Sequence, residues 1–178
     1  MAAKDAKTKI IKFKAKLDKF SPESGWHFIP VSKEMADSLE FTSKGRRVIC
    51  TLNGTERLQC ALMPYQGAFF MMINKGVRTR LGIEPGDTVA VELVRDDSTY
   101  GMEMPEEFRE VLNQDPDGDR MFHELTPGRQ RSLIYLVSKV KDLDRRIHTA
   151  LLIIDHLRKN EGKINGERLY EELKRPVL

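Results

Sequence analysis

The sequence predicts an α+β protein: a small six-stranded, closed or strongly bent β-barrel followed by a C-terminal three-helix unit. Two patterns carry this prediction. Between residues 10 and 97, short apolar runs, mostly of period two, are separated by Gly, Pro, Asn and Ser turns, as in small barrels. From residue 104 to residue 178 the apolar spacing is helical. Residues 98–103 are expected to be a polar linker, and residues 1–9 a disordered, basic N-terminus.

Composition and charge narrow the class of protein. Of the 178 residues, 40% are hydrophobic and 32% are charged, as in soluble folded domains. No apolar run is long enough to span a membrane, and the lysine-rich start lacks the apolar core of a secretory signal. Two cysteines without metal-ligand spacing fit a reducing compartment. We therefore expect a cytoplasmic protein, and the mild net charge of +3 makes nucleic acid a disfavoured partner.

The first strands and their helix follow from local patterns. Residues 11–17 alternate apolar side chains with lysines, which predicts a strand whose lysines face water. We interpret these lysines as protection of an edge strand, with a nucleic-acid patch as the alternative. Residues 26–31 predict a second strand, which Pro30 confines to an edge or an end. Ser32 is expected to cap a short helix over residues 33–39.

The next two strands, residues 46–52 and 58–63, are joined around Asn53-Gly54. A two-residue turn would place their apolar side chains on opposite faces, so we expect a three- or five-residue connection. That register gives one shared face to Val48, Cys50, Leu52, Leu58, Cys60 and Leu62. The two cysteines are then diagonal or directly opposite. We interpret them as reduced core residues, with a disulfide or redox switch as the alternative.

The end of the predicted barrel contains a glycine-rich corner. Residues 68–73 are a fifth expected strand, apolar on both faces. A short basic helix then ends at Gly82, which can adopt the left-handed conformation. Pro85-Gly86 suits the centre of a type II turn, and Asp87 is placed to accept backbone amides of that turn. Residues 88–94 alternate as the last strand.

Helical spacing dominates the C-terminal part. It covers residues 105–112, 126–140, 144–159 and a tail segment, residues 168–173. Thr126 is the expected N-cap of the second helix, and Pro176 stops the tail segment. In the third helix, the residues expected near the buried side are Ile147, Leu151, Ile154 and His156-Leu157.

The segment Asp115-Pro116-Asp117-Gly118-Asp119 begins like a calcium-binding loop. Its sixth position is Arg120 instead of glycine, and its twelfth is Thr126 instead of glutamate. We interpret it as an aspartate-rich loop that caps the next helix. The histidines at 27, 123, 148 and 156 share no ligand spacing, so neither a metal nor a cofactor is expected.

The candidate binding residues are basic and lie close to the corner: Arg46, Arg47, Lys75, Arg78 and Arg80. They are predicted to line one end of the barrel, where backbone amides of the glycine turns would help to hold an anion. A solvated charged rim is the alternative. The sequence nominates no nucleophile or general base, so an enzyme is the less favoured class.

Two further arginines open the third helix of the C-terminal part. Arg145 and Arg146 stand where the helix dipole disfavours cations. They are therefore expected to face an acidic surface such as that of Glu106, Glu107 or Asp142.

Several short motifs stand in order along the chain: the Phe13 strand, Gly25-Trp26, Thr51-Leu52-Asn53-Gly54, Leu62-Met63-Pro64, Asn74-Lys75-Gly76-Val77-Arg78, and Leu81-Gly82 to Gly86-Asp87-Thr88-Val89. This order resembles a small β-barrel domain of unknown function found in bacteria. In the C-terminal part the motifs are Met104-Pro105-Glu106-Glu107, a loop around Phe122, Thr126-Pro127, and Arg146-Ile147. They resemble the YdeI/OmpD-associated, or bacteriocin-protection, family.

Together these resemblances cover about residues 10 to 158. They imply a non-catalytic binding or stress-protection module, and the family label implies protection against bacteriocins or cationic peptides. The expected partner is a small anionic ligand or a protein, and a monomer is favoured. No catalytic residues are implied.

An alternative resemblance is to AbrB-like DNA-binding transcriptional regulators. It rests on an Arg-x-x-Leu-Gly segment followed by a Gly-Asp-x-Val-x-Val segment, matched here by Arg78, Leu81, Gly82, Gly86, Asp87, Val89 and Val91. That fold needs a dimer to complete its sheet. Because this chain supplies several strands upstream, a self-contained barrel is the favoured interpretation.

Overall fold

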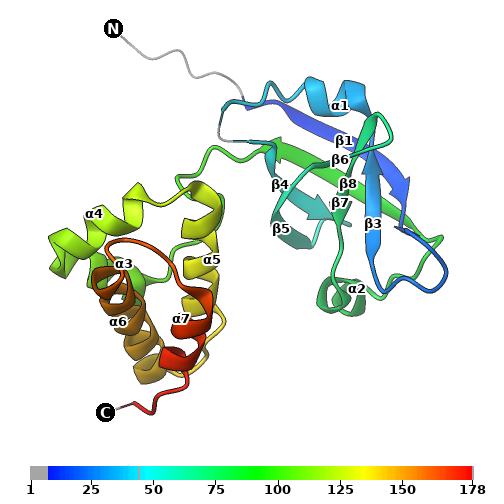
Figure 1. Ribbon diagram of the computed structural model, residues 1–178. Helices are drawn as coiled ribbons and strands as arrows, with labels where there is room; N and C mark the ends of the chain where they lie inside the picture. The colour runs from blue at the N-terminus through cyan, green and yellow to red at the C-terminus, as the bar shows by residue number, and fades with distance from the viewer. Residues whose placement is uncertain (1–7, 44, 178) are drawn as a thin grey trace, which may run out of the picture. The chain divides into compact units, whose positions relative to one another are not determined.

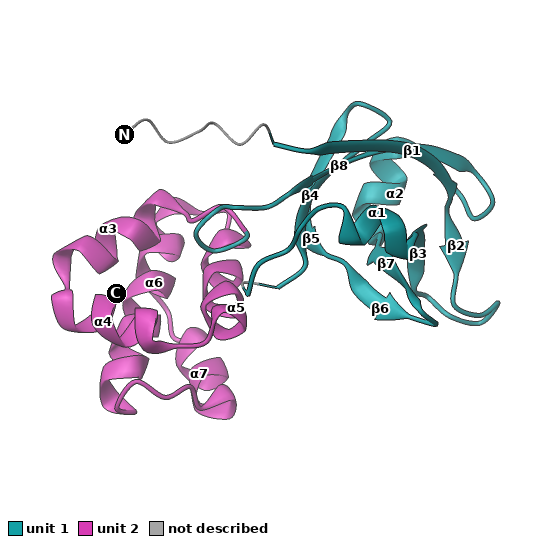
Figure 2. Ribbon diagram, turned by 90° about the horizontal axis from the view of Figure 1, so that it is seen from above, with its two compact units in different colours: residues 1–101 teal, residues 102–178 magenta. Residues whose placement is uncertain are grey.

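The computed structural model describes residues 8–43 and 45–177. The chain divides into two compact units, Met1–Gly101 and Met102–Leu178 (Figure 2). Eight strands and seven helices in the described residues confirm the α+β class. The predicted disorder of residues 1–9 lies, for residues 1–7, outside the described residues; Thr8 and Lys9 precede the first strand.

The first unit contains two four-stranded antiparallel sheets (Figure 1). The first sheet has the order β1-β8-β4-β5, with β1 (Ile10–Lys16), β8 (Thr88–Arg95), β4 (Arg47–Leu52) and β5 (Glu56–Ala61). The second has the order β2-β3-β7-β6, with β2 (Asp18–Lys19), β3 (His27–Val31), β7 (Ala68–Met72) and β6 (Met63–Tyr65). Two short helices complete the unit, α1 (Lys33–Asp37) and α2 (Lys75–Leu81).

Of the predicted closed or strongly bent six-stranded barrel, the closed form is wrong, and the described residues form eight strands in two sheets. The chain passes from one sheet to the other at Leu17 and at Leu62, both buried. Their N–H groups donate to the carbonyls of Asp87 (3.0 Å) and Arg46 (2.8 Å). No ladder joins the two sheets within the described residues. The two additional strands, β2 and β6, have two and three residues, too few to show an alternating pattern.

The two sheets share one hydrophobic core. It includes Val48 and Leu93 from the first sheet and Ile29 and Met71 from the second. As predicted, β1 is an edge strand, with its lysines exposed and its alternate residues packed against the core. Ser32 caps α1, because its hydroxyl accepts the Met35 N–H at 3.2 Å.

The predicted β4–β5 register is confirmed. The connection has three residues, so Val48 lies opposite Cys60 and Cys50 lies opposite Leu58. The two cysteines are therefore diagonal neighbours, and both are free thiols. Burial raises the pKa of Cys60 to about 11 and raises the pKa of Cys50 further above its ordinary value. Both thiols are thus protonated core groups with low nucleophilicity.

The predicted corner is also confirmed. Gly82 ends α2 in the left-handed conformation, with φ 62° and ψ 36°. In the following turn the Asp87 N–H donates to the Glu84 carbonyl (3.0 Å), and the Asp87 carboxylate accepts the Glu84 N–H (2.8 Å). The Gly86 N–H donates to the carbonyl of Leu17 at 2.8 Å. The corner therefore fixes the end of β1, at the point where the chain changes sheets.

The second unit is built from five helices instead of three. They are α3 (Glu106–Gln114), α4 (Pro116–Glu124), α5 (Pro127–Ser138), α6 (Leu143–Lys159) and α7 (Gly166–Leu173). The prediction that residues 115–119 form a loop capping the helix that starts at Thr126 is wrong, because these residues begin α4 itself. Thr126 is the N-cap residue of α5 as predicted, but its side chain makes no capping hydrogen bond. Asp115 caps α4 by accepting the Gly118 N–H at 2.9 Å, and Pro116 occupies the first helical position. Turn-forming residues here therefore begin a helix.

The central element of this unit is α6, which packs against α3, α4, α5 and α7. Phe108 of α3 and Phe122 of α4 are fully buried, and their rings meet edge-to-face at 5.2 Å between centroids. Ile153 and Leu157 supply the side of α6 that is buried completely.

A buried polar pair attaches α7 to α6. His156 donates from Nδ1 to the Glu172 carboxylate at 2.7 Å, and its Nε2 accepts the Asn165 N–H at 3.1 Å. Because Nε2 accepts, Nδ1 is the ring nitrogen that carries the proton donated to Glu172. Arg168 donates to the other Glu172 oxygen at 3.2 Å. The prediction that His156 lies near the buried side of its helix is confirmed, but neither that prediction nor metal-ligand spacing detects its pairing with Glu172.

Acid is expected to weaken the attachment of α7. Burial opposes the charged form of Glu172, but hydrogen bonds from His156 and Arg168 outweigh burial and hold the pKa of the carboxyl below its ordinary value. A carboxyl with a depressed pKa contributes stability above its unfolded pKa of about 4.3. That contribution is lost as the pH falls through the folded pKa.

The measurement is urea unfolding of the second unit at about pH 7, 5 and 4. The free energy of unfolding should fall below about pH 5, and Glu172→Gln should reduce the slope. The pKa of Asp115 is also lowered, by the Gly118 N–H and by Arg158. Asp115 therefore contributes to the pH dependence of the free energy of unfolding, and the slope should not fall to zero in Glu172→Gln. An unchanged slope in Glu172→Gln would contradict the assignment.

Candidate functional site

The five predicted binding residues do not converge. Arg46 and Arg47 lie at the start of β4, whereas Arg80 on α2 forms an ion pair with Glu56 through its Nε (3.0 and 3.2 Å) and Nη2. Glu56 lies opposite Leu52, at the far end of β4. Six residues of strand span about 17 Å, so the two groups are at opposite ends of this sheet.

The arginines of β4 have structural partners. Arg47 donates from Nη2 to the Gly101 carbonyl at 2.7 Å and helps to hold the segment after β8. The guanidinium of Arg46 lies 5.0 Å from the centroid of the Phe69 ring. Lys75 and Arg78 lie on α2, and the Nε of Arg78 is buried without a partner in the described residues. Anion binding near α2 stays a prediction.

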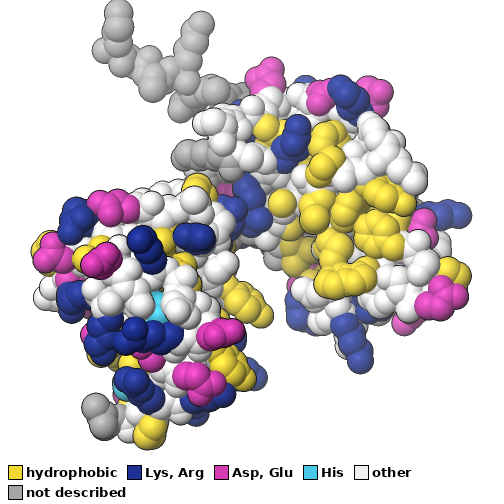
Figure 3. Space-filling model, viewed as in Figure 1, with side chains coloured by type: hydrophobic (Ala, Val, Ile, Leu, Met, Phe, Trp, Pro, Cys, Tyr) yellow, Lys and Arg dark blue, Asp and Glu magenta, His cyan; other side chains and the backbone are white. Residues whose placement is uncertain are grey.

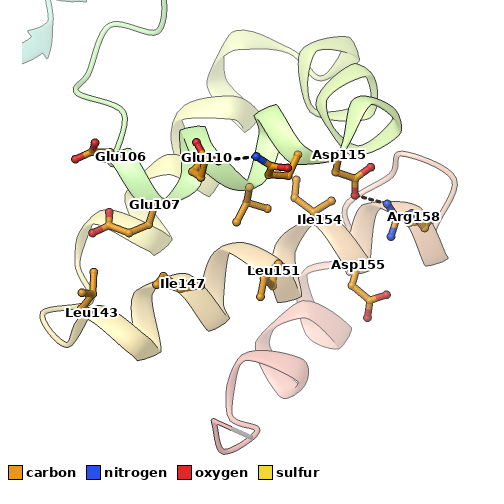
Figure 4. A pocket seen from close by; sticks show the side chains of 12 residues that line it. Glu106, Glu107, Glu110, Asp115, Leu143, Ile147, Leu151, Ile154, Asp155 and Arg158 are labelled. Carbon is orange, nitrogen blue, oxygen red and sulfur yellow. Dashed lines mark hydrogen bonds and ion pairs between the residues drawn. The ribbon is translucent and has the colours of Figure 1, made fainter.

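A different feature is a groove of about 880 Å³ between α3 and α6 (Figure 4). Its walls come from these two helices and from the residue that follows α3. The residues that line it are Glu106, Glu107, Glu110, Val111, Gln114, Asp115, Leu143, Ile147, Leu151, Ile154, Asp155 and Arg158.

The floor of the groove is apolar. Leu143, Ile147 and Leu151 follow one another at four-residue intervals, so they form one stripe along α6. They are 56%, 38% and 52% exposed. Val111 and the buried Ile154 complete the floor. The prediction that Ile147 and Leu151 face the buried side is therefore wrong, because the other helices cover a different part of α6.

The rim of the groove is acidic. Three glutamates of α3 stand above the stripe, and Asp155 and Asp115 lie towards the other end (Figure 4). Arg158 is the only cation in the lining, and it pairs with Asp115. Asp155 pairs with Lys159 on its own helix.

The three glutamates differ in their partners. Glu107 accepts from Arg146 at 2.9 Å, which confirms that Arg146 faces an acidic surface. Glu110 accepts from Gln114 at 2.7 Å. Among the described residues, neither Glu106 nor Glu110 has a cationic partner. Helix-dipole stabilisation explains acids in the first turn of α3, but it does not extend to Glu110 in the second.

The site was missed at the level of sequence because each half has an ordinary explanation. The glutamates of α3 suit its dipole, and the stripe on α6 suits a core. One signal for the groove was present in the sequence: the apolar stripe already begins at Leu143, the first residue of α6. Leu143 is 56% exposed in the structure.

Comparison with known families places both units. Residues 13–93 match the model of a domain of unknown function, DUF1905. Residues 101–160 match the family described as bacteriocin-protection, YdeI or OmpD-associated. The chain thus carries a match to each of these two family models, in this order along the sequence. The YdeI/OmpD-associated segment includes both helices of the groove. A search of curated proteins found no match.

Other predictions can be compared with these findings. The matches give no support to the AbrB-like alternative, and β8 already has partner strands on both sides from its own chain. In the described part of the chain, no helix is both long and apolar enough to cross a membrane. Within the same residues, no three acidic, cysteine or histidine side chains gather as a metal site.

Proposed function

We propose that the YdeI/OmpD-associated segment is a non-catalytic binding module whose groove takes an amphipathic, positively charged helical peptide. The observation that carries this proposal is an exposed apolar stripe lying beneath an acidic rim. Amphipathic helices bind such grooves through apolar side chains spaced three or four residues apart.

The apolar floor supplies the affinity. From Leu143 to Ile154 the floor extends for about 16 Å along α6, roughly three turns of a bound helix. Leu143 and Leu151 each leave about half of their surface exposed. Covering an aliphatic side chain of that exposure is worth about 1 kcal/mol. The stripe therefore contributes on the order of 3 kcal/mol before the anchors of the peptide are counted.

The rim selects the charge of the partner. Five carboxylates line the groove against one arginine, and that arginine is already paired. Lys and Arg side chains flanking the apolar face of a peptide would meet Glu106 and Glu110. An acidic peptide would meet like charge at these positions, so its binding is disfavoured.

The description of the family supports the same chemistry. A groove that holds a cationic amphipathic peptide would sequester it and so protect a cell from it. The label of bacteriocin protection is consistent with such a role. Sequestration needs no catalytic group, and none lines the groove beyond the carboxylates already described.

The test is a titration of the full chain with a labelled Leu/Lys helical peptide of about 14 residues. Micromolar binding is expected, and it should weaken as salt rises from about 0.05 to 0.5 M. Leu151→Ser should weaken binding about tenfold, or 1.4 kcal/mol. Glu110→Gln should weaken it about twofold to fivefold and reduce the salt dependence.

Matched controls separate the groove from the general surface. Tyr170→Ser removes an exposed large side chain from α7, and Glu167→Gln removes an exposed acid from the same helix. Both variants should bind like the parent chain. A Leu/Glu peptide that binds as well as the Leu/Lys peptide, or a Leu151→Ser variant that binds normally, would refute the proposal.

A further inference from the structure

The second sheet of the first unit is apolar on both of its faces. Ile29 and Met71 point into the core, so their neighbours along β3 and β7 point outward. The outward row across the sheet is Pro30, Phe70 and Met63, which lie opposite one another in register. The sequence predicted that residues 68–73 are apolar on both faces. In the structure, the neighbouring strands β3 and β6 also place apolar residues on the outer face.

Aromatic side chains dominate this outer face. Phe20 stacks on Phe28 with ring centroids 4.4 Å apart and meets Phe70 edge-on at 5.0 Å. Tyr65 meets Phe70 at 6.0 Å. Figure 3 shows hydrophobic side chains gathered over the region of β3, β6 and β7. Trp26, Met63 and Tyr65 remain 62%, 46% and 44% exposed.

The face carries almost no charge. In the strands of this sheet, Asp18 is the only charged residue placed outward. It lies on the two-residue edge strand β2, opposite Phe28 of β3. Lys19 and His27 have the opposite orientation. A nucleic acid would need cations here, and a polar ligand would need hydrogen-bonding groups. The chemistry of the face fits another uncharged, aromatic surface.

We propose that this face binds the same face of a second copy of the chain. A self-complementary contact brings apolar and aromatic residues together without burying ions. Two antiparallel sheets pack face to face at about 10 Å. A two-fold axis along the strands sets β2 of one copy over β6 of the other and keeps the two Asp18 carboxylates apart.

The size of the face sets the strength of the dimer. Four strands are about 15 to 19 Å wide, and β3 is about 17 Å long, which gives a footprint of roughly 300 Å² per copy. Even with the relief of the side chains, the total lies below about 1,200 Å², the range of weak and transient interfaces. The dimer is therefore expected to be weak and reversible.

Trp26 makes this proposal directly measurable, because it is the only tryptophan of the chain, directly precedes β3 and is exposed. Between about 5 µM and 1 mM protein, the sedimentation mass should rise from monomer towards dimer. Over the same range the Trp26 emission should shift to the blue. No peptide is added, so the outcome is independent of the groove.

Variants locate the contact. Met63→Lys places a charge on an exposed edge-strand position and should shift the midpoint of association upward by at least tenfold. Tyr135→Lys, at a similarly exposed position on α5, should leave association unchanged. Circular dichroism checks that both variants are folded. A chain that stays monomeric at about 1 mM, Trp26 emission that is already blue in dilute solution, or association insensitive to Met63→Lys would each overturn the proposal.

Discussion

Replacing His156 with alanine is expected to lower the free energy of unfolding of the helical unit by about 3–5 kcal/mol. The substitution removes both hydrogen bonds of the ring, to Glu172 and to the Asn165 N–H. Glu172 is 5% exposed, and its remaining side-chain partner is Arg168, which lies closer to solvent. A buried carboxylate that loses one partner has no water to replace it. The cavity left by the imidazole adds to the loss.

A loss of this size is a large fraction of the stability of a small domain. Urea unfolding followed by circular dichroism measures it, and hydrogen exchange at the Asn165 amide reports the detachment of α7. The matched control is His123→Ala, since His123 is exposed on α4 and its Nδ1 contacts the Asp119 carbonyl of the same helix. The control should change stability by less than about 0.5 kcal/mol. A similar loss in both variants would show that the buried pair has no special role.

Gly118→Ala is expected to destabilise the helical unit by about 1–3 kcal/mol, although alanine is the better helix former. A Cβ at Gly118 would stand 2.3 Å from Cγ2 of Ile154 on α6 and 3.0 Å from the carboxyl group of Asp115. The 2.3 Å distance is too short for a real contact, so α4 would have to move away from α6. The same movement would disturb the cap that Asp115 forms with the Gly118 N–H.

Gly166→Ala is the control for this prediction. Gly166 opens α7, and a Cβ added to it would meet no atom within 4 Å, so alanine there should be neutral or stabilising by up to about 1 kcal/mol. Ile154→Leu removes the branch at Cβ that causes the clash, so it should recover part of the loss in the double variant. If the changes in unfolding free energy caused by Gly118→Ala and Ile154→Leu simply add, the clash does not involve the Cγ2 atom of Ile154.

The local elements of this chain could be predicted because their determinants are close together in sequence. Ser32 caps a helix three residues away, and Asp87 accepts the N–H of Glu84. The β4–β5 register followed from matching apolar faces across a short connection. Each of these features depends only on residues that lie close to one another in the sequence.

The failures have a common physical cause. The pattern over residues 115–119 has turn chemistry, yet α4 forms because Phe122 and Gly118 pack against other helices. The basic residues that looked like one cluster are divided by the length of β4. His156 and Glu172 are sixteen positions apart, so no spacing rule connects them.

By itself, the sequence determined the α+β class, the order of the two families, and the corner from Gly82 to Asp87, because these depend on period, composition and backbone preference. The tertiary structure alone decided which apolar surfaces remain exposed. On α6, the neighbouring helices cover one side and leave the stripe of Leu143, Ile147 and Leu151 under the acidic rim. Apolar spacing shows that a surface can be buried, but only the packed neighbours determine whether it is.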